Sequence, residues 1–178
     1  MYFKKIIPSI LAVLLITTSI TANNTDPKKT DDTIVSVAAS NDNFSTLVAA
    51  VKAAGLVKVL NSDGPFTVFA PANSAFEKLP KGTVASLLKP ENKKLLTSIL
   101  TYHVISGKFV AKDVIKAIKA NNNKFVIKTV QGNKLTASIV NGKVVLTDVK
   151  GNTSTVVITD VPASNGVVHA IDTVVMPK

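Results

Sequence analysis

Histidine, cysteine and carboxylate side chains are the groups that most often hold metal ions or transfer protons, and this chain has few of them. There are two histidines, His103 and His169, no cysteine, and only two glutamates, Glu77 and Glu91. A zinc site would therefore need aspartate ligands, and the aspartates show no metal-site spacing. We expect neither a metal ion nor a cofactor.

Motifs of nucleophilic hydrolysis and of nucleotide binding are absent from the sequence. It contains no G-x-S-x-G elbow, no G-x-x-x-x-G-K-[ST] loop and no G-x-G-x-x-G turn. A pair of carboxylates that hydrolyses glycosides would have to assemble from distant aspartates. The sequence therefore predicts a protein that is not an enzyme.

The charge is strongly basic and comes from lysine alone. The chain has 21 lysines, no arginine and 11 acidic residues, for a net charge of +10. Such a surface attracts anionic polymers through screened forces, although scattered lysines also serve simply to keep a protein in solution. Without arginine, bidentate readout of bases is disfavoured, so we expect no specific nucleic-acid partner.

The N-terminus has the pattern of a secretory signal peptide. Lys4 and Lys5 precede an apolar run over residues 6–20, and a polar stretch begins after Ala22. The run is shorter than the roughly 20 residues that span a bilayer as a helix. We predict a signal peptide over residues 1–22, no permanent membrane span after cleavage, and a secreted, extracellular or periplasmic protein.

The rest of the chain divides into a short tether and one domain. Residues 23–33 are polar and contain Pro27, which predicts a flexible tether. The folded domain is expected over residues 34–178, in a single copy because no internal repeat is visible. It must fold without disulfides, since the chain lacks cysteine.

The first half of this domain has helical periodicity. Apolar residues recur at helical spacing from Phe44 to Val51, with Asp42 or Asn43 as the expected cap and Gly55 as the stop. The further helical segments expected are 56–60, 73–77 with Asn73 as its cap, and a leucine-rich stretch from Thr83 that is interrupted at Pro90.

The second half changes to the period of strands. The Asn141-Gly142 dipeptide is the strongest hairpin signal of the chain. The strands expected are 66–69, before the helical stretch, and then 124–130, 135–140, 143–147, 153–161 and 167–176. Helices followed by a meander of strands predict an α+β domain.

Three short motifs place polar residues inside apolar patterns. They are TVFAPANSAF at residues 67–76, Tyr102-His103 at the end of the leucine-rich stretch, and GVVHAIDTVVMP at residues 166–177. In the last motif, alternation puts His169 among apolar neighbours, which predicts a hydrogen-bonded core histidine that ties the last strand to a loop. Asp172 either bonds a backbone group or faces a partner.

These motifs, in this order and spacing, strongly resemble the fasciclin-like (FAS1) domain family over residues 35–178. The resemblance implies a β-wedge of about seven strands flanked by several short helices. It also implies a secreted module for cell adhesion and extracellular-matrix contact that acts by non-catalytic binding. The residues that would form the structural motifs are Thr67, Phe69, Pro71, Asn73, Phe76, His169, Asp172 and Pro177.

The resemblance also implies a partner-binding segment, because family members of animal origin use the region around the Tyr-His pair in receptor binding. Cell-surface or matrix proteins or glycans would be the partners, and self-association is one route to multivalency. Packing inside the domain is the other interpretation of Tyr102 and His103. The candidate partner-binding residues are Tyr102, His103, Val104, Ile105 and Phe109.

Two other functions stay open at this point. One is a lysine-based cationic binder of anionic extracellular polymers, such as acidic polysaccharide or extracellular DNA. The other is a carrier for a small apolar ligand in a cleft between the wedge and the helices.

Overall fold

The computed structural model describes residues 32–178, so the predicted signal peptide and most of the predicted tether lie outside the described residues. The elements, in chain order, are α1 (Ile34–Ala39), η1 (Asp42–Phe44), α2 (Ser45–Ala54), α3 (Val57–Leu60), β1 (Phe66–Pro71), α4 (Asn73–Glu77), α5 (Thr83–Leu87), η2 (Pro90–Asn92), α6 (Lys93–Tyr102), β2 (Val104–Ser106), α7 (Ala111–Ala120), β3 (Phe125–Lys128), β4 (Lys134–Val140), β5 (Lys143–Thr147), β6 (Thr153–Ala163) and β7 (Gly166–Ile171).

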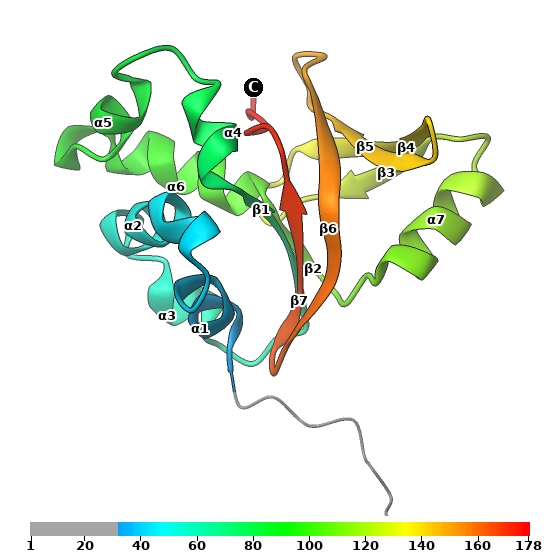
Figure 1. Ribbon diagram of the computed structural model, residues 1–178, viewed down its shortest axis with the longest axis horizontal. Coiled ribbons are helices and arrows are strands. Elements are labelled where there is room, and N and C mark those ends of the chain that lie inside the picture. The colour runs from blue at the N-terminus through cyan, green and yellow to red at the C-terminus, as the bar shows by residue number, and fades with distance from the viewer. Residues whose placement is uncertain (1–31) are drawn as a thin grey trace, which may run out of the picture.

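Seven strands form one mixed sheet in the order β2-β1-β7-β6-β5-β4-β3 (Figure 1). β1 and β7 are paired in parallel, and the other neighbours are antiparallel. The parallel pair joins two of the motifs, because residues 66–71 lie directly beside residues 166–171. The predicted α+β fold with seven strands and short helices is confirmed.

The long strand β6 connects the two halves of this sheet. Residues near its start pair with β5, and residues 156–163 pair with β7. The β6–β7 register shifts twice, between Val156 and Ile158 and between Ile158 and Val161. Because such irregularities bend a strand and increase its twist, β6 turns the sheet into a wedge with two separate inner surfaces.

The first core lies between the helices α1 to α6 and the β2-β1-β7 half of the sheet. Val68 and Ala70 of β1, with Val168 and Ala170 of β7, point into it. The alternate residues of the same strands, such as Phe69, point into the second core. The central strands are therefore buried on both faces, which explains their nearly continuous apolar sequence.

The second core fills the open side of the wedge. α7 packs Val114 and Ile118 against the inner face of β3, β4 and β5, where Leu135 and Leu146 are fully buried. In Figure 1, α7 and these three strands lie together on the right, away from α1 to α6. Period-two alternation along β4 and β5 supplies this apolar face.

Local backbone signals predicted several boundaries correctly. Asn141 and Gly142 have φ values of 51° and 75° and join β4 to β5, as the hairpin signal indicated. Gly55 ends α2 in the left-handed region with φ of 74°. The interruption of the leucine-rich stretch at Pro90 is also confirmed, since η2 separates α5 from α6.

Other boundaries need correction. Neither Asp42 nor Asn43 caps the helix predicted from Phe44, because α2 has no side-chain cap from its N-cap residue, and Asn41 caps the preceding η1. Asp32 and Thr33 belong to the folded unit and not to the tether, because the Asp32 carbonyl accepts a hydrogen bond from Ser164 N and Thr33 caps α1.

The last strand is also shorter than predicted: β7 ends at Ile171 and does not extend to 176. Side chains take over the backbone hydrogen bonds there. The Asp172 carboxylate accepts from Thr155 N–H, and Ser154 Oγ accepts from Thr173 N–H.

Candidate functional site

His103 follows directly after α6 and is 2% exposed. Its Nδ1–H donates to the Ile99 carbonyl at 2.8 Å, and its Nε2 accepts from Val175 N–H at 3.3 Å. Burial lowers the pKa of His103 to about 4, although the hydrogen bond to Ile99 opposes this shift. The imidazole is neutral at pH 7, and both ring nitrogens are engaged by the backbone.

His169, also 2% exposed, joins three segments of the chain. Its Nε2–H donates to the Phe109 carbonyl at 2.8 Å, and its Nδ1 accepts from Asp160 N–H at 3.2 Å. The ring packs on Phe69 with a centroid distance of 5.6 Å. His169 therefore ties β7 to β6 and to the loop before α7, in the structural role that we predicted from the alternation.

The neighbouring Asp160 fixes the start of α7. Its Oδ1 accepts from Ala111 N–H at 2.7 Å, and α7 has no side-chain cap from Val110 at its own N-cap position. Asp160 has φ of 59° and lies close to the β6 irregularity. Asp160 was not predicted from the sequence, because the helix that it caps begins 49 residues earlier in the chain.

Thr67 also holds the loop before α7, the loop that His169 contacts through the Phe109 carbonyl. Its hydroxyl donates to the Gly107 carbonyl at 2.7 Å and accepts from Phe109 N–H at 2.8 Å, and the residue is fully buried. Two motifs thus converge on one loop, since Thr67 of β1 and His169 of β7 both hold the segment around Phe109.

Most of the predicted partner-binding segment is buried, which agrees with the packing interpretation of Tyr102 and His103 and not with direct contact to a partner. Tyr102 is 0% exposed, and its hydroxyl donates to the Lys134 carbonyl at 2.7 Å. His103 is held as described above, and β2 directs Val104 into the first core and Ile105 into the second. Of the five candidates, Phe109 alone is partly exposed, and it packs against Phe125.

Asn73 does cap a helix, but not its own. The N-cap position of α4 is Ala72, and Asn73 is the first residue of that helix. The Asn73 Oδ1 accepts from Thr46 N–H at 3.1 Å near the start of α2, and its Nδ2 donates to the Asp42 carbonyl at 2.8 Å. The amide therefore connects α4 to η1 and α2.

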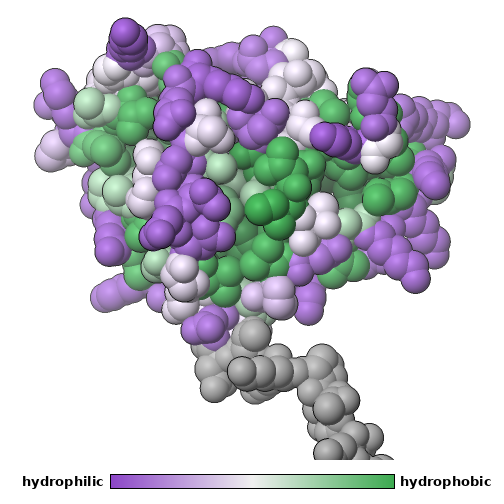
Figure 2. Space-filling model, viewed as in Figure 1, coloured by the Kyte–Doolittle hydropathy of each residue, from purple (hydrophilic) through white to green (hydrophobic). Residues whose placement is uncertain are grey.

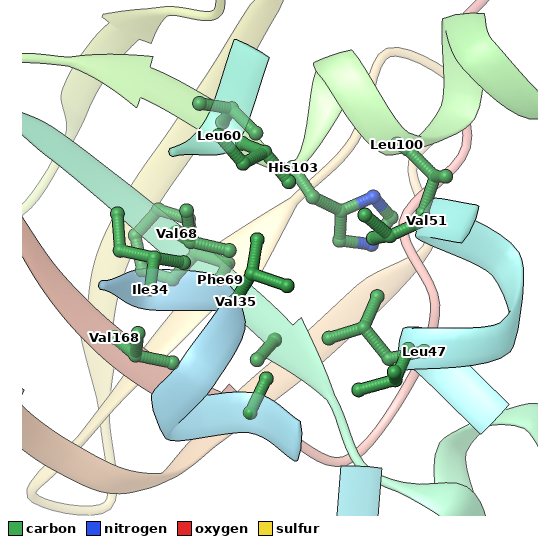
Figure 3. A pocket seen from close by; sticks show the side chains of 14 residues that line it. Ile34, Val35, Leu47, Val51, Leu60, Val68, Phe69, Leu100, His103 and Val168 are labelled. Atoms are coloured by element: carbon green, nitrogen blue, oxygen red, sulfur yellow. The ribbon is translucent and has the colours of Figure 1, made fainter. Parts of the chain in front are cut away.

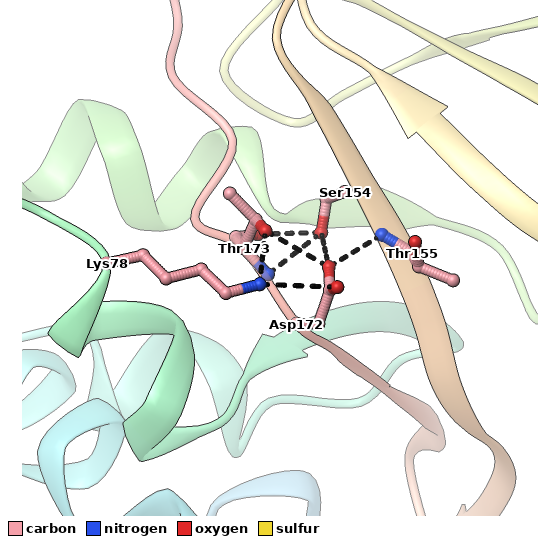
Figure 4. A network of polar contacts seen from close by, with 5 residues as sticks. All are labelled: Lys78, Ser154, Thr155, Asp172 and Thr173. Atoms are coloured by element: carbon pink, nitrogen blue, oxygen red, sulfur yellow. Dashed lines mark hydrogen bonds and ion pairs between the residues drawn. The ribbon is translucent and has the colours of Figure 1, made fainter.

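Asp172 and Lys78 are part of a small polar network at the end of β7 (Figure 4). The Asp172 carboxylate accepts from Thr155 N–H at 2.8 Å and lies 3.3 Å from Lys78 Nζ. Burial opposes its ionisation, but the hydrogen bonds from Thr155, Thr173 and Lys78 together hold the pKa of Asp172 below its usual range. Of our two alternatives for Asp172, the bond to a backbone group is the one observed.

Asp148 anchors the C-terminal segment and was not singled out from the sequence. This carboxylate is 6% exposed and accepts from Lys150 N–H, Asn152 N–H, the Asn152 amide and Met176 N–H, at 2.8 to 3.0 Å. Burial opposes its ionisation, but these hydrogen bonds hold the pKa of Asp148 below its usual range. The Asp-x-x-Gly-Asn turn was a local signal, whereas the contact with Met176 was not.

The other predicted motif residues lie in the two cores, at the end of β1 and near the C-terminus. Phe69 and Phe76 are buried in the second and the first core, respectively. Pro71 is the last residue of β1, and Pro177 is buried close to the C-terminus.

A cavity of about 30 Å³ lies between α1, α2, α6 and the central strands (Figure 3). Its walls are apolar, with Ile34, Leu47 and Val68 among them, and the His103 ring borders it. A space of this size holds a molecule as small as water and no larger apolar ligand unless the walls move. The cavity therefore provides no support for the ligand-carrier alternative.

Two negative findings apply to the described part of the chain. Across residues 32–178, no three histidine or acidic side chains gather as metal ligands would. No helix in the same range has the length and apolar character that crossing a bilayer requires.

Comparison with known proteins places this architecture among characterised folds. The Fasciclin domain matches residues 42–177. Protein sll1483 of Synechocystis is 53% identical over 145 residues, which cover 82% of this chain and 73% of that protein. The cell surface glycolipoprotein MPB83 of Mycobacterium bovis is 36% identical over 153 residues, 82% of this chain and 61% of that protein.

A solved structure has the same fold. The FAS1 domain pair of the insect cell adhesion molecule fasciclin I matches with a TM-score of 0.70 at 20% identity. The match covers 80% of this chain and 50% of that one. At this identity the similarity establishes the fold alone.

Proposed function

Because the chain belongs to the Fasciclin domain family, we propose that it is a secreted module for cell adhesion or extracellular-matrix contact that acts by binding and not by catalysis. One relative supports this proposal, because it is described as a cell surface glycolipoprotein. The solved structure, from an insect cell adhesion molecule, agrees with it at the level of the fold alone.

The observation that carries the proposal is how the domain uses its buried polar side chains. Thr67, His103, Asp148, Ser154 and His169 all bond backbone groups. A histidine whose two nitrogens are both occupied has no free position for a substrate proton. These buried side chains therefore stabilise the fold, and we infer that partners are recognised by the exposed surface.

Part of the predicted binding segment belongs to that surface. Ser106 and Lys108 are exposed and Phe109 is partly exposed, on the loop that Thr67 and His169 hold in place. A loop that is fixed by buried hydrogen bonds loses little conformational entropy when it binds a partner. We include this loop in the adhesive surface.

A single domain joins two bodies only if it has two binding surfaces or associates with itself. The proposal therefore requires either a second contact surface or a dimer. Sedimentation of the exported protein would measure its association state directly.

Binding to cell surfaces is the decisive test. The exported protein would be incubated with cell envelopes and matrix extract at low and high salt, beside an unrelated monomeric protein of the same net charge. We expect retention of the protein but not of the control, with partial retention at high salt. A strictly monomeric protein that binds neither extract would contradict the proposal.

A further inference from the structure

The net charge of the described chain is concentrated in one region. Residues 106–147, which we call the basic lobe, contain eight lysines and one acidic residue, a net charge of +7. The other described residues, 32–105 and 148–178, contain nine lysines and eight acidic residues, a net charge of +1. The basic lobe comprises α7, β3, β4 and β5, which lie together in Figure 1, and hydrophilic side chains rim that side of the molecule in Figure 2.

The lysines of the basic lobe are not neutralised within the domain. Across residues 32–178 the ion pairs are Lys78–Asp172 and Lys89–Glu91, and neither involves the lobe. Lys128 of β3 and Lys134 of β4 are direct cross-strand partners, and both are exposed. Like charges in directly opposite positions destabilise a sheet, so this pair costs folding free energy that an external anion would offset.

The exposed side of β3 to β6, which we call the outer face, carries these two lysines. No other element covers it, since alternate residues of its strands point inward to the second core while the remainder stay half-buried or exposed. Lys143 lies on the same face at the other end of the hairpin. Three valines expose about half of their surface here: Val126 (46%), Val140 (48%) and Val157 (52%).

Hydroxyl groups occupy the middle of the outer face. Thr136, Thr147 and Thr153 are cross-strand partners in one row, and Ser138 and Thr155 flank Val145 in the next. Within the described residues, none of the four threonine hydroxyls of this face makes a hydrogen bond to another protein group. They are available to a ligand, at the spacing of about 4.8 Å that separates neighbouring strands.

We propose that the outer face binds an acidic polysaccharide, with the lysines contacting its carboxylates and the threonine hydroxyls contacting its sugar hydroxyls. This inference rests on the proposed function and names its partner class and its surface. Lysine ammonium groups bind carboxylates as point charges, and hydroxyl side chains both donate and accept hydrogen bonds, as sugars do.

Other partners fit the outer face less well. Single-stranded nucleic acid is held by stacking on aromatic rings, and the alternating exposed positions of β3 to β6 carry no aromatic residue. A second copy of the chain would bring two strongly positive lobes together, which charge repulsion disfavours. The charge and the hydroxyl rows together favour the acidic polysaccharide.

The chain contains a matched control for the two facing lysines. Lys112 and Lys116 of α7 are exposed, belong to the same basic lobe and carry the same charge. They lie on the opposite side of the lobe, because α7 packs Val114 and Ile118 against the inner face of the sheet. Lys128→Gln/Lys134→Gln and Lys112→Gln/Lys116→Gln therefore lower the net charge equally and differ only in position.

The test measures the affinity of the exported chain for polygalacturonate by calorimetric titration at low salt, with neutral dextran and single-stranded DNA as comparison polymers. We expect the outer-face pair of substitutions to weaken binding about tenfold and the α7 pair less than about twofold. Equal losses in the two variants would show attraction by net charge alone and overturn the proposal. Tighter binding of DNA, or no binding of polygalacturonate, would overturn it as well.

Two further measurements separate binding from folding. Because the outer-face substitutions remove a like-charge pair, we expect the thermal midpoint of that variant to be no lower than that of the wild type. Thr136→Val/Thr147→Val keeps charge and approximate shape, and we expect it to weaken polygalacturonate binding about threefold. Unchanged affinity in the threonine variant would remove the hydroxyl rows from the site and overturn the choice of a polysaccharide.

The two proposals fail in distinguishable ways. Envelope binding and polygalacturonate binding that both persist in the outer-face variant would overturn this inference and leave the adhesion function standing. If the wild-type protein does not bind envelopes at all, that result would contradict the adhesion function itself.

Discussion

The N–H of Asp160 donates a hydrogen bond of 3.2 Å to Nδ1 of His169, and the Asp160 carboxylate caps α7. A buried histidine of the last strand is thereby linked, through one aspartate, to the helix that closes the second core. α7 has no side-chain cap at its own N-cap position, so the cap comes from Asp160 of β6.

Replacing Asp160 tests that dependence. We expect Asp160→Ala to lower the free energy of unfolding by about 2 kcal/mol, because it removes a helix cap and places alanine at a positive φ. Asp160→Asn keeps an acceptor and tolerates this backbone, so its cost should be below about 1 kcal/mol. Urea unfolding measures both values. Asp113→Ala, at an exposed position in the first turn of α7, is the control, and an equal loss there would contradict the capping role.

His103 makes the stability of the domain dependent on pH. Its folded pKa of about 4 lies below the ordinary value of 6.5, so the unfolded chain gains a proton before the folded one as pH falls. The contribution of His103 to the free energy of unfolding should therefore be fully present above about pH 6.5 and fall by about 3 kcal/mol between pH 6.5 and pH 4. Urea titrations at several pH values would measure it.

The control for this prediction is His103→Gln, which cannot titrate. The variant should be less stable at pH 7, because glutamine does not reproduce the geometry of the two imidazole hydrogen bonds to the Ile99 carbonyl and the Val175 N–H. Its stability should depend less on pH across the same window. An unchanged slope would exclude His103 as the source.

Gly166 lies at the start of the parallel β1–β7 pair, and a Cβ added there would meet the Phe66 carbonyl oxygen at 2.0 Å. Because that contact is with backbone, Gly166→Ala should lower the free energy of unfolding by about 3 kcal/mol. Gly142→Ala is a control in open space that bears only the cost of its left-handed backbone, about 1 kcal/mol. Urea unfolding measures both losses. Similar losses in the two variants would show that the contact between a Cβ at position 166 and the Phe66 carbonyl does not destabilise the fold.

Asp148 should be the most sensitive of the structural carboxylates. Asp148→Asn sets an amide N–H₂ against a cluster of N–H donors, and we expect a loss of about 3 kcal/mol. The exposed Asp63→Asn should change stability by less than about 0.5 kcal/mol. Thermal unfolding compares them, and the C-terminal segment around Met176 should gain hydrogen exchange in the Asp148 variant alone.

Features that depend on a few neighbouring residues could be predicted from the chain alone. The hairpin at Asn141-Gly142 and the stop at Gly55 follow from left-handed backbone conformations that few residues tolerate. The apolar neighbours of His169 along its strand predicted a buried, bonded imidazole, because a polar ring that lies among apolar side chains must find hydrogen-bond partners.

The burial of Tyr102 to Ile105 could not be predicted in the same way. β2 is an edge strand, and edge strands are often exposed. Here helices cover one side and the second core covers the other, so both faces are closed. The partners of Asn73 and Asp160 were equally hidden, because they lie 27 and 49 residues away along the chain.

The sequence by itself determined the α+β order of elements, the motif positions and the excess of lysine between residues 106 and 147, since each is a local property of composition and period. Only the tertiary structure decided which polar side chains are buried and bond distant backbone groups, and that Lys128 lies opposite Lys134. Burial and cross-strand register arise from contacts between distant segments, and those contacts exist only when both cores have formed.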